Sequence, residues 1–259
     1  MRDILEDFKK GKLTLEEAER LLKMDFIHCS DVAKLDINRK HRTGVPEVVV
    51  TEDKTLEDTI EITKNFLDKN SRVVLTRIPA SYNAELEKIE GSVVEYHPKS
   101  KVSVVFRKDS PPPPKTGGKV GIITAGTSDI PVAEEARIIV EECGCEAHTA
   151  YDVGVAGIHR LFPSLEDMIK KGMDVFIVAA GREGALPTLI AGVVDAPVIG
   201  IPISSGYGKA GKGESALYAM LQSCSPLTVV NIDAGFTAGA VAAQIANKIA
   251  NARKNNATE

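Results

Sequence analysis

The C-terminal half of the sequence contains glycine-rich segments whose side chains suit the binding of a phosphorylated substrate. One segment, Thr124–Asp129, places Gly126, Thr127, Ser128 and Asp129 just before an acidic helix. Small residues let backbone amides approach an anion, hydroxyl groups can donate to phosphate, and a helix N-terminus favours negative charge. Helix capping explains the same residues as readily. We interpret this segment as a candidate phosphate cradle.

A second segment, Asp152–Arg160, ends in a histidine and an arginine near the start of a predicted helix. The imidazole of His159 could transfer protons or bind a cation, and the Arg160 guanidinium could hold a phosphate or carboxylate. A capping or packing role would explain the histidine equally well. Both residues remain candidates for the site.

A third segment, Ala179–Pro187, follows the central strand Asp174–Val178, which we expect to be fully buried. Directly after that strand come Gly181, Arg182 and Glu183. Two charges are therefore predicted at the centre of the crevice that forms beyond the carboxyl ends of parallel strands. Charges that serve only solubility are less expected there. We therefore favour a functional interpretation of Arg182 and Glu183.

A fourth segment begins with Ser204 and Ser205 and continues into glycines and lysines. Gly206–Lys212 has the spacing of a P-loop, but Gly213 stands where that motif needs a magnesium-binding Ser or Thr. The same glycines fit the dinucleotide fingerprint weakly, with Asp233 about twenty residues on. The helix starts too late for that motif, so a mobile lid bearing lysines is the better interpretation.

Four cysteines are too few and too unevenly placed for a disulfide framework. The pair Cys143 and Cys145 lacks the two-residue spacer usual in zinc and redox pairs, and we expect it to be buried. Cys29 lies in the other half of the chain. Cys224 ends a helix, and from the residues alone a small buried hydrophobic side chain is more common there than a nucleophile.

These segments are expected at one edge of an α/β sheet. Apolar strands are predicted at Val120–Thr124, Glu146–Tyr151, Val175–Ala179, Val198–Pro202 and Thr228–Ile232, with helices between them that begin near Pro131, Gly157, Ala185, Glu214 and Gly235. This alternation predicts a doubly wound parallel sheet covered on both faces, with ligands beyond the carboxyl ends of the strands. The small residues of the last helix suit packing against another subunit or within the chain.

The N-terminal half predicts a small α+β domain. Helices are expected at Arg2–Lys10, Leu15–Lys23 and Leu56–Asp68, and strands at Glu47–Val50, Val73–Thr76, Ser92–Tyr96 and Val102–Arg107. The polar segment Asp36–Glu47 is a functional loop or, more simply, a solvated one. Four consecutive prolines mark a linker. The predicted domains are residues 1–110 and 119–259, joined by the linker 111–118.

Composition narrows the classes of function. The formal net charge of −4 argues against a nucleic-acid partner, which would require clustered Lys and Arg. The sequence holds neither a run of about eighteen apolar residues nor a signal sequence, so we expect no membrane association and a cytoplasmic location.

Residues 119–250 resemble the PurE family of aminoimidazole ribonucleotide carboxylases and mutases. Gly126–Asp129 stands at the GSxSD position, Ile158–Arg160 at the AHR position and Ala180–Pro187 at the GGAAHLPG position. The resemblance implies a PurE-like, flavodoxin-like domain of three layers. Where PurE has its second histidine, however, this sequence has Ala185.

The departures from PurE are similar to features of the LarB family, whose members synthesise the nickel-pincer nucleotide. Arg182, Glu183 and Cys224 belong to this pattern. So do further stretches of both halves: Ala33–Asp36, Arg39, Arg42 and Gly44–Glu47, and Ser223–Pro226 followed by Val229–Phe236. LarB proteins use CO2 or bicarbonate to carboxylate the pyridinium ring of nicotinic acid adenine dinucleotide, and they release AMP by hydrolysis of the phosphoanhydride.

The resemblance implies roles for the candidate residues. Cys224 would form a transient adduct with the ring, Glu183 and His159 would act in catalysis and hold a divalent cation, such as magnesium, and Arg160 and Arg182 would neutralise the pyrophosphate. The remaining substrate-binding candidates are Gly126, Thr127, Ser128, Asp129, Asp152, Gly181, Ser204, Ser205 and Asp233. No organic cofactor is expected, and by analogy with PurE we expect a homo-oligomer, an octamer.

Three alternatives remain open. The first is a PurE-type enzyme that moves a carboxylate on aminoimidazole ribonucleotide, and the second is a nucleotide-binding module without turnover. The third is a dinucleotide-dependent oxidoreductase that uses the weak glycine fingerprint.

Overall fold

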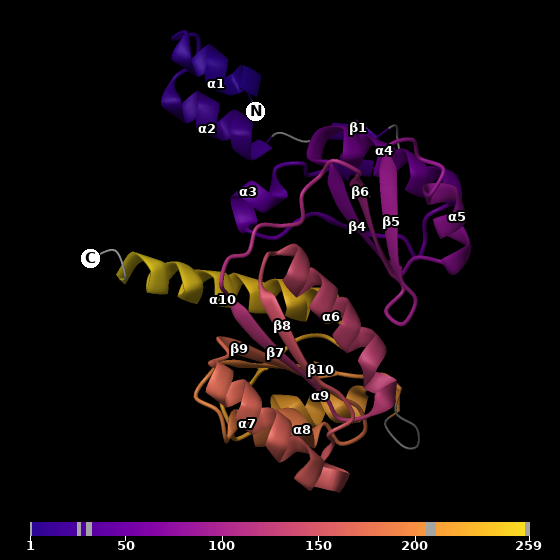
Figure 1. Cartoon of the computed structure of the whole chain (residues 1–259), viewed down its shortest axis with the longest axis vertical. Coiled ribbons are helices and arrows are strands. Elements are labelled where there is room, and N and C mark those ends of the chain that lie inside the picture. Colours follow the sequence, from indigo (N-terminus) through magenta and orange to yellow (C-terminus); the bar gives the residue numbers. More distant parts are fainter. Residues whose placement is uncertain (1, 25–26, 30–32, 206–210, 257–259) are drawn as a thin grey trace. The chain divides into compact units, whose positions relative to one another are not determined.

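The computed structural model describes residues 2–24, 27–29, 33–205 and 211–256, and it divides the chain into two compact units, Met1–Ser110 and Pro111–Glu259 (Figure 1). We call these unit 1 and unit 2. Each has its own hydrophobic core, one built around Phe66 and Leu75 and the other around Phe176 and Leu161. Each unit is described by itself below.

Unit 1 contains an antiparallel pair of strands and a mixed sheet in the order β3-β4-β6-β5. Its elements are α1 (Arg2–Lys9), α2 (Leu15–Met24), β1 (Ile27–Cys29), β2 (Ala33–Leu35), α3 (Arg39–Thr43), β3 (Val48–Val50), α4 (Leu56–Asn70), β4 (Arg72–Thr76), η1 (Ala80–Tyr82), α5 (Asn83–Leu86), β5 (Ser92–His97) and β6 (Val102–Arg107). The Thr55 hydroxyl caps α4 by accepting the Asp58 amide at 3.1 Å. The small α+β unit predicted from the sequence is confirmed, although β1, β2, α3 and α5 were not predicted.

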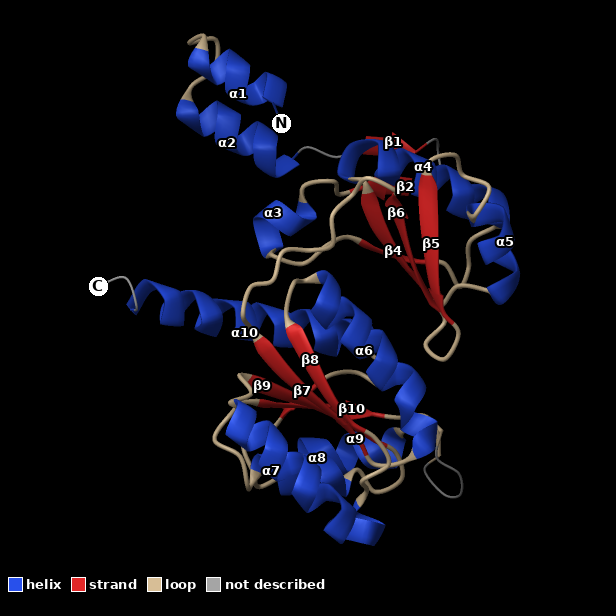
Figure 2. Ribbon diagram, viewed as in Figure 1, coloured by secondary structure: helices blue, strands red, loops and turns tan. Residues whose placement is uncertain are grey.

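Unit 2 contains a parallel sheet in the order β11-β10-β9-β7-β8. Its elements are β7 (Lys119–Thr124), η2 (Thr127–Asp129), α6 (Ile130–Glu142), β8 (Glu146–Ala150), η3 (Val155–Arg160), α7 (Leu161–Lys171), β9 (Val175–Ala180), α8 (Ala185–Ala191), β10 (Val198–Pro202), α9 (Glu214–Leu221), β11 (Thr228–Val229) and α10 (Gly235–Asn256). Helices α6 and α10 cover one face of the sheet, and α7, α8 and α9 cover the other (Figure 2). The predicted α/β fold is confirmed.

The small residues of α10 serve packing within the chain. Ala238, Ala242 and Ala246 are fully buried. A Cβ at Gly239 would lie 2.6 Å from the Ala136 carbonyl oxygen of α6, so only glycine permits this approach of the two helices. Of the two packing roles considered for these residues, the structure therefore shows the one within the chain.

The last strand is shorter than the sequence predicts. It pairs with β10 at two positions only, Thr228 and Val229. Two residues after Val229, the Asn231 side chain accepts the Ile232 amide at 2.8 Å. This local hydrogen bond competes with the ladder of an edge strand, which has a partner on one side alone.

Candidate active site at the carboxyl ends of the parallel strands

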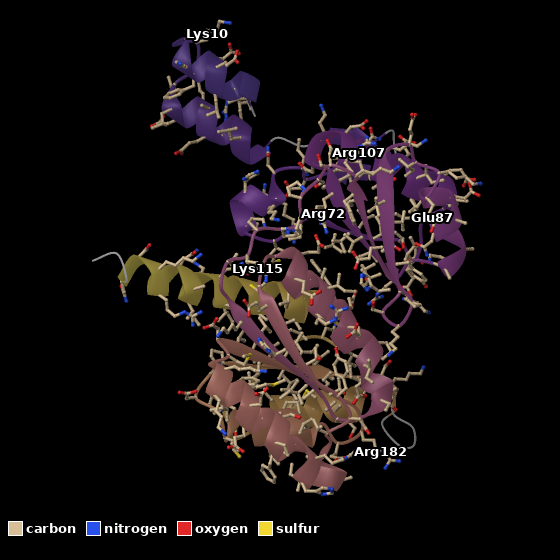
Figure 3. The ribbon with its side chains drawn as sticks, in the orientation of Figure 1. Lys10, Arg72, Glu87, Arg107, Lys115 and Arg182 are labelled. Carbon is tan, nitrogen blue, oxygen red and sulfur yellow. The ribbon has the colours of Figure 1, made fainter. Side chains whose placement is uncertain are left out.

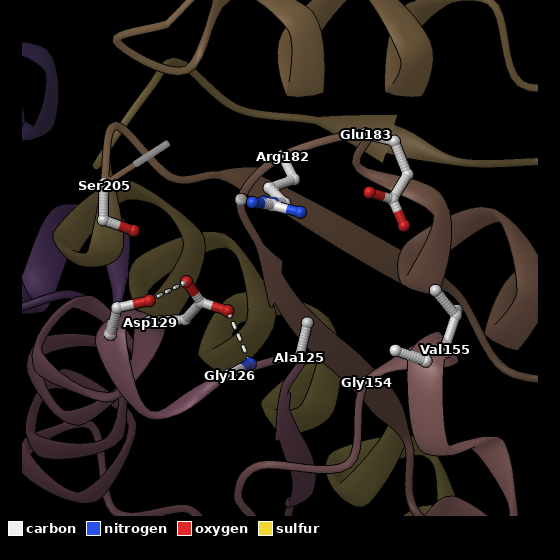
Figure 4. Close-up of a pocket in the computed structure, with 11 residues that line it drawn as sticks. Ala125, Gly126, Asp129, Gly154, Val155, Arg182, Glu183 and Ser205 are labelled. Carbon is white, nitrogen blue, oxygen red and sulfur yellow. Dashed lines mark hydrogen bonds between the residues drawn. The ribbon is translucent and has the colours of Figure 1, made fainter. Parts of the chain in front are cut away.

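A pocket of about 390 Å³ opens at the carboxyl ends of the unit 2 strands. Strand β7 lies at the position where the chain order reverses, with β8 on one side and β9 on the other. The segments that follow these two neighbours must diverge there and leave a crevice. Segments after β7, β8, β9 and β10 all contribute to the pocket wall (Figure 4).

Asp129 is the buried acid of this pocket, with 3% of its surface exposed. One carboxylate oxygen accepts the Gly126 amide at 2.8 Å, and the other accepts the Ser128 hydroxyl at 3.3 Å. Burial raises the pKa of the Asp129 carboxyl, and hydrogen bonds from Gly126, Ser128 and Gly181 oppose that shift. The carboxylate therefore shapes the turn after β7 and places Gly126 and Ser128 in the wall.

The wall requires close backbone approach where the segments after β7 and β8 meet. A Cβ at Gly154 would lie 2.6 Å from the Ala125 carbonyl oxygen, so a larger residue would push the two segments apart. Val155 and Ala156 continue the wall from this point. These pocket residues were not singled out from the sequence, although their place just after two strands is a signal that points to them.

Arg182 and Glu183 line the pocket from the tight turn after β9 (Figure 4). Figure 3 labels Arg182 on the whole chain. The turn is closed by the Gly184 amide, which donates to the Gly181 carbonyl at 3.0 Å. Arg182 has a φ of 47°, which is costly for a residue with a side chain. A Cβ at Gly184 would lie 2.7 Å from the Ala216 carbonyl oxygen, so packing against α9 fixes the turn.

Ser205 lines the pocket, whereas Ser204 and Asp233 do not. The Asp233 carboxylate accepts the Ser204 amide at 2.9 Å, and the Asp233 amide donates to the Pro202 carbonyl at 3.0 Å. Asp233 therefore holds the end of β10 in place. The predicted lid lies in part outside the described residues, since residues 206–210 are not among them.

Four further candidates lie outside the pocket wall. Thr127 is exposed beside Ser128, and His159 is exposed at the end of η3. Arg160 pairs with Asp152, Nη1 to Oδ2 at 2.8 Å. The structure thus places this pair and His159 on the segment that follows β8, but not in the wall that it forms.

Cys224 lies away from the pocket of its own chain. It is exposed between α9 and β11, at the edge of the sheet where strands begin. Its neighbour Ser225 lies near Gly192, which follows α8 and precedes β10. Strands of five or six residues, at about 3.3 Å per residue, separate the two edges by roughly 17–20 Å. Within one chain the structure does not bring Cys224 to Glu183.

The described residues include no group of three or more His, Cys, Asp or Glu side chains that could hold a metal ion. Of the predicted metal pair His159 and Glu183, only Glu183 lines the pocket. Magnesium commonly binds proteins through one or two carboxylates and otherwise through phosphates and water. Glu183 fits that pattern, and His159 is not required by it.

No helix among the residues described is both long and apolar enough to span a bilayer.

Comparisons with known proteins match both units. The AIR carboxylase family model matches residues 119–259, and the LarB/PurE-like N-terminal domain model matches residues 27–107. An uncharacterized protein of Methanocaldococcus jannaschii is 46% identical over 255 residues, which cover 95% of this chain and 96% of that protein.

Unit 2 also matches proteins with assigned activities. The N5-carboxyaminoimidazole ribonucleotide mutase of Thermotoga maritima is 31% identical over 133 residues, 49% of this chain and 74% of the mutase. The Pyrococcus horikoshii mutase is 36% identical over 132 residues, 49% and 71% of the two chains. A crystal structure of a PurE2 variant from Treponema denticola aligns with a TM-score of 0.39 and 18% identity, covering 55% of this chain and 96% of that one. The family models show that this chain belongs to the AIR carboxylase family and carries a LarB/PurE-like domain ahead of unit 2 in the sequence.

Proposed function

We propose that the chain is a carboxylase and hydrolase of the LarB type. It would convert nicotinic acid adenine dinucleotide, CO2 and water to pyridinium-3,5-biscarboxylic acid mononucleotide and AMP. The observation that carries the proposal is the match of unit 1 to a LarB/PurE-like domain. The unit 2 pocket supports it, because Arg182 and Glu183 line that pocket. Ala185 stands where PurE has its second histidine. This difference argues against the transfer of a carboxylate on aminoimidazole ribonucleotide.

The pocket suits the phosphate and ribose of such a substrate. Gly126 and Ser128 offer small, polar wall positions, and Asp129 can accept hydroxyl hydrogens. Arg182 brings a positive charge to the same opening. Its guanidinium would neutralise charge on a pyrophosphate more effectively inside a pocket than in open water.

Carboxylation of a pyridinium ring needs a nucleophile, because the cationic ring is electron-poor. A thiolate at Cys224 would add to a ring carbon and leave a neutral, enamine-like ring whose adjacent carbon attacks CO2. Loss of the proton from that carbon, followed by departure of the thiolate, restores the aromatic ring. Glu183 is the pocket carboxylate available to accept this proton.

Because Cys224 lies at the opposite edge of its own sheet, the proposed mechanism requires this residue from a second copy of the chain. Two exposed apolar residues suit a covered surface here. Leu221, three residues before Cys224, is 62% exposed, and Val193, next to the Gly192 that Ser225 approaches, is 56% exposed. We therefore infer a homo-oligomer, with the octamer of the PurE proteins as its expected form. The site would be incomplete in a monomer.

Hydrolysis of the phosphoanhydride would need further charge neutralisation. Glu183 would hold a divalent cation, such as magnesium, which when bound withdraws charge from the pyrophosphate oxygens. Arg160 could contribute only after it leaves Asp152, its partner in the structure described. His159, exposed on the same segment, remains a candidate proton carrier.

The test is incubation of the purified protein with nicotinic acid adenine dinucleotide, bicarbonate and magnesium. The proposal expects stoichiometric AMP and a mononucleotide with two ring carboxylates, identified by mass spectrometry. Conversion of N5-carboxyaminoimidazole ribonucleotide instead would favour the mutase activity of the relatives. Binding without turnover of either would favour a nucleotide-binding module, and accumulation of dihydropyridine absorbance would favour an oxidoreductase.

A further inference from the structure

One side chain from outside the strand holds the chain as it leaves β10. The Ile203 amide donates to the Ala180 carbonyl at 3.1 Å, which continues the pairing of β10 with β9. The next amide, that of Ser204, donates instead to the Asp233 carboxylate at 2.9 Å. In the part of the chain that the structure describes, no other hydrogen bond holds Ser204 or Ser205. The path from the sheet to Ser205 therefore depends on Asp233.

Asp233 is itself fixed between β11 and α10. Its amide donates to the Pro202 carbonyl at 3.0 Å, and its carbonyl accepts the Gly235 amide at 3.0 Å. Its φ is 54°, in the left-handed region, where a side chain costs free energy and where Asp and Asn are tolerated better than other side chains. A Cβ at Gly235 would lie 2.5 Å from the Val132 carbonyl oxygen, so close packing on α6 fixes the start of α10. The carboxylate thus projects from a well-anchored part of unit 2.

Ser205 brings a hydroxyl group to the pocket, whereas Asp233 is not among the residues that line it. The Ser205 Oγ and the Asp129 Oδ1 each lie 3.6 Å from the position that a Cβ at Gly181 would take. Figure 4 shows Ser205 on the Asp129 side of the pocket, apart from Glu183. A hydroxyl in this place can donate a hydrogen bond to a ligand or accept one, provided that the chain keeps it there.

We propose that Asp233 is a positioning residue of the unit 2 pocket. Its carboxylate binds the Ser204 amide and thereby places the Ser205 hydroxyl beside Asp129, and it does not touch the ligand itself. A hydrogen bond from an amide to a charged carboxylate is stronger than one to a neutral acceptor, which suits this role. The inference rests on the function proposed for the pocket, and it replaces the substrate-binding role that the resemblance implied for Asp233.

The first test compares two variants of the ligand-free full chain. Asp233→Asn and Asp233→Gly both accept the left-handed backbone, but only asparagine keeps an oxygen acceptor for the Ser204 amide. Hydrogen exchange, read by mass spectrometry with fragmentation to single residues, measures the protection of that amide. Exchange should be about tenfold faster or more in Asp233→Gly and only about threefold faster in Asp233→Asn.

The second test measures the binding of AMP and of nicotinic acid adenine dinucleotide by isothermal titration calorimetry. Asp233→Gly and Ser205→Ala should each weaken binding about threefold to tenfold, which corresponds to the loss of one hydrogen bond. The double variant should bind no more weakly than Ser205→Ala does, and Asp233→Asn should recover most of the affinity. In turnover, Asp233→Gly should raise KM more than it lowers kcat, because it displaces a binding contact and leaves Glu183 in place.

The matched control is Ser71→Gly, at a φ of 58° where α4 of unit 1 ends. It removes a side chain from the same backbone conformation and should leave Ser204 exchange and AMP binding unchanged. Unchanged Ser204 exchange in Asp233→Gly, or additive losses of affinity in the double variant, overturns the proposal. Weak binding in Asp233→Asn with full protection of the Ser204 amide would instead show that Asp233 contacts the ligand directly.

Failure of the proposed function gives a different result. Absence of carboxylation, together with the expected Ser204 exchange and AMP binding, would reject the LarB-type activity and keep the role of Asp233. Absence of binding by either nucleotide would overturn both. If Asp233→Gly folds poorly, Asp233→Asn and Ser205→Ala decide the matter, because unchanged Ser204 exchange in the first and unchanged affinity in the second would overturn the proposal.

Discussion

At the scale of single residues, the buried carboxyl group of Asp129 affects the pH dependence of stability as well as the proposed activity. Because burial raises its pKa, the folded chain holds a proton there more tightly than the unfolded chain does. The stability that this proton contributes is fully present below the unfolded pKa and is lost as the pH rises through the folded pKa. An asparagine would keep an oxygen acceptor for the Gly126 amide without this dependence.

Asp129→Asn should therefore remove this pH dependence, so the free energy of unfolding of the variant relative to the unaltered chain should rise between pH 4 and pH 7. Carboxylation should fall about tenfold or more, because the proposed acceptor of substrate hydroxyls is altered. Urea unfolding at the two pH values and initial rates measure both effects. A relative stability that falls between pH 4 and pH 7 would contradict the assignment of burial as the dominant influence on this pKa.

Arg182 is a second residue of this kind, because its positive φ costs free energy and strained residues often serve function. Glycine accepts its φ of 47° without strain but loses more entropy on folding, so the two effects nearly cancel. Arg182→Gly should change unfolding free energy by less than about 1 kcal/mol and reduce carboxylation at least about tenfold. Lys101→Gly, at a φ of 53° in the exposed turn between β5 and β6, is the matched control and should keep full activity.

At the scale of elements, Arg253 of α10 binds residues at the beginning of the unit 2 sheet. Arg253 donates to both Asp174 oxygens, at 2.5 and 3.1 Å, and to the Gly117 carbonyl at 3.0 Å. Asp174 is 3% exposed in its side chain and also accepts the Lys119 amide at 2.8 Å. The contact thus joins α10 to the residues that precede β7 and β9.

Removal of the cation should leave a buried carboxylate short of a partner. Arg253→Met is expected to lower the free energy of unfolding by about 1–2 kcal/mol, with activity at the remote pocket retained. Asp174→Asn combined with Arg253→Met should recover part of that loss, which a double-mutant cycle in urea measures. Additive effects of the two changes would show that the pair is not coupled.

At the scale of the whole molecule, the distance between Cys224 and the pocket makes assembly a condition of the proposed chemistry. Cys224→Ala should be inactive alone, and Arg182→Gly should keep about a tenth of the activity or less. Coexpressed with different tags and purified as mixed assemblies, they should regain activity, because one subunit supplies an intact pocket and its neighbour an intact thiol. Inactive mixed assemblies would mean that both groups act within one chain, whereas activity of Cys224→Ala alone would mean that Cys224 is not used.

Thiol labelling tests independently whether Cys224 is accessible and lies at the substrate site. In a Cys29→Ser background, iodoacetamide should modify Cys224 in the folded protein, and bound nicotinic acid adenine dinucleotide should protect it. Cys143 and Cys145 are buried, and burial raises the pKa of Cys145 to about 11, so both should react only after unfolding. Peptide mass spectrometry distinguishes the sites.

The sequence by itself determined the fold class and most of the elements, because apolar periodicity, glycines and caps act over a few residues. Strands β7 to β10 and the turn Gly181–Gly184 follow from such local patterns. The same patterns place candidate groups just after strands, and for Asp129, Arg182 and Glu183 that is enough, since parallel strands end at a common edge.

The tertiary structure alone decided which of these groups share a space. Strand order brings the segments after β7, β8, β9 and β10 around one pocket, whereas Asp233 serves the end of β10 and His159 stays outside the wall. It also places Cys224 at the opposite edge, although only a few residues separate it from the last strand. Such relations depend on contacts between residues distant in the chain, and spacing along a sequence does not encode them directly.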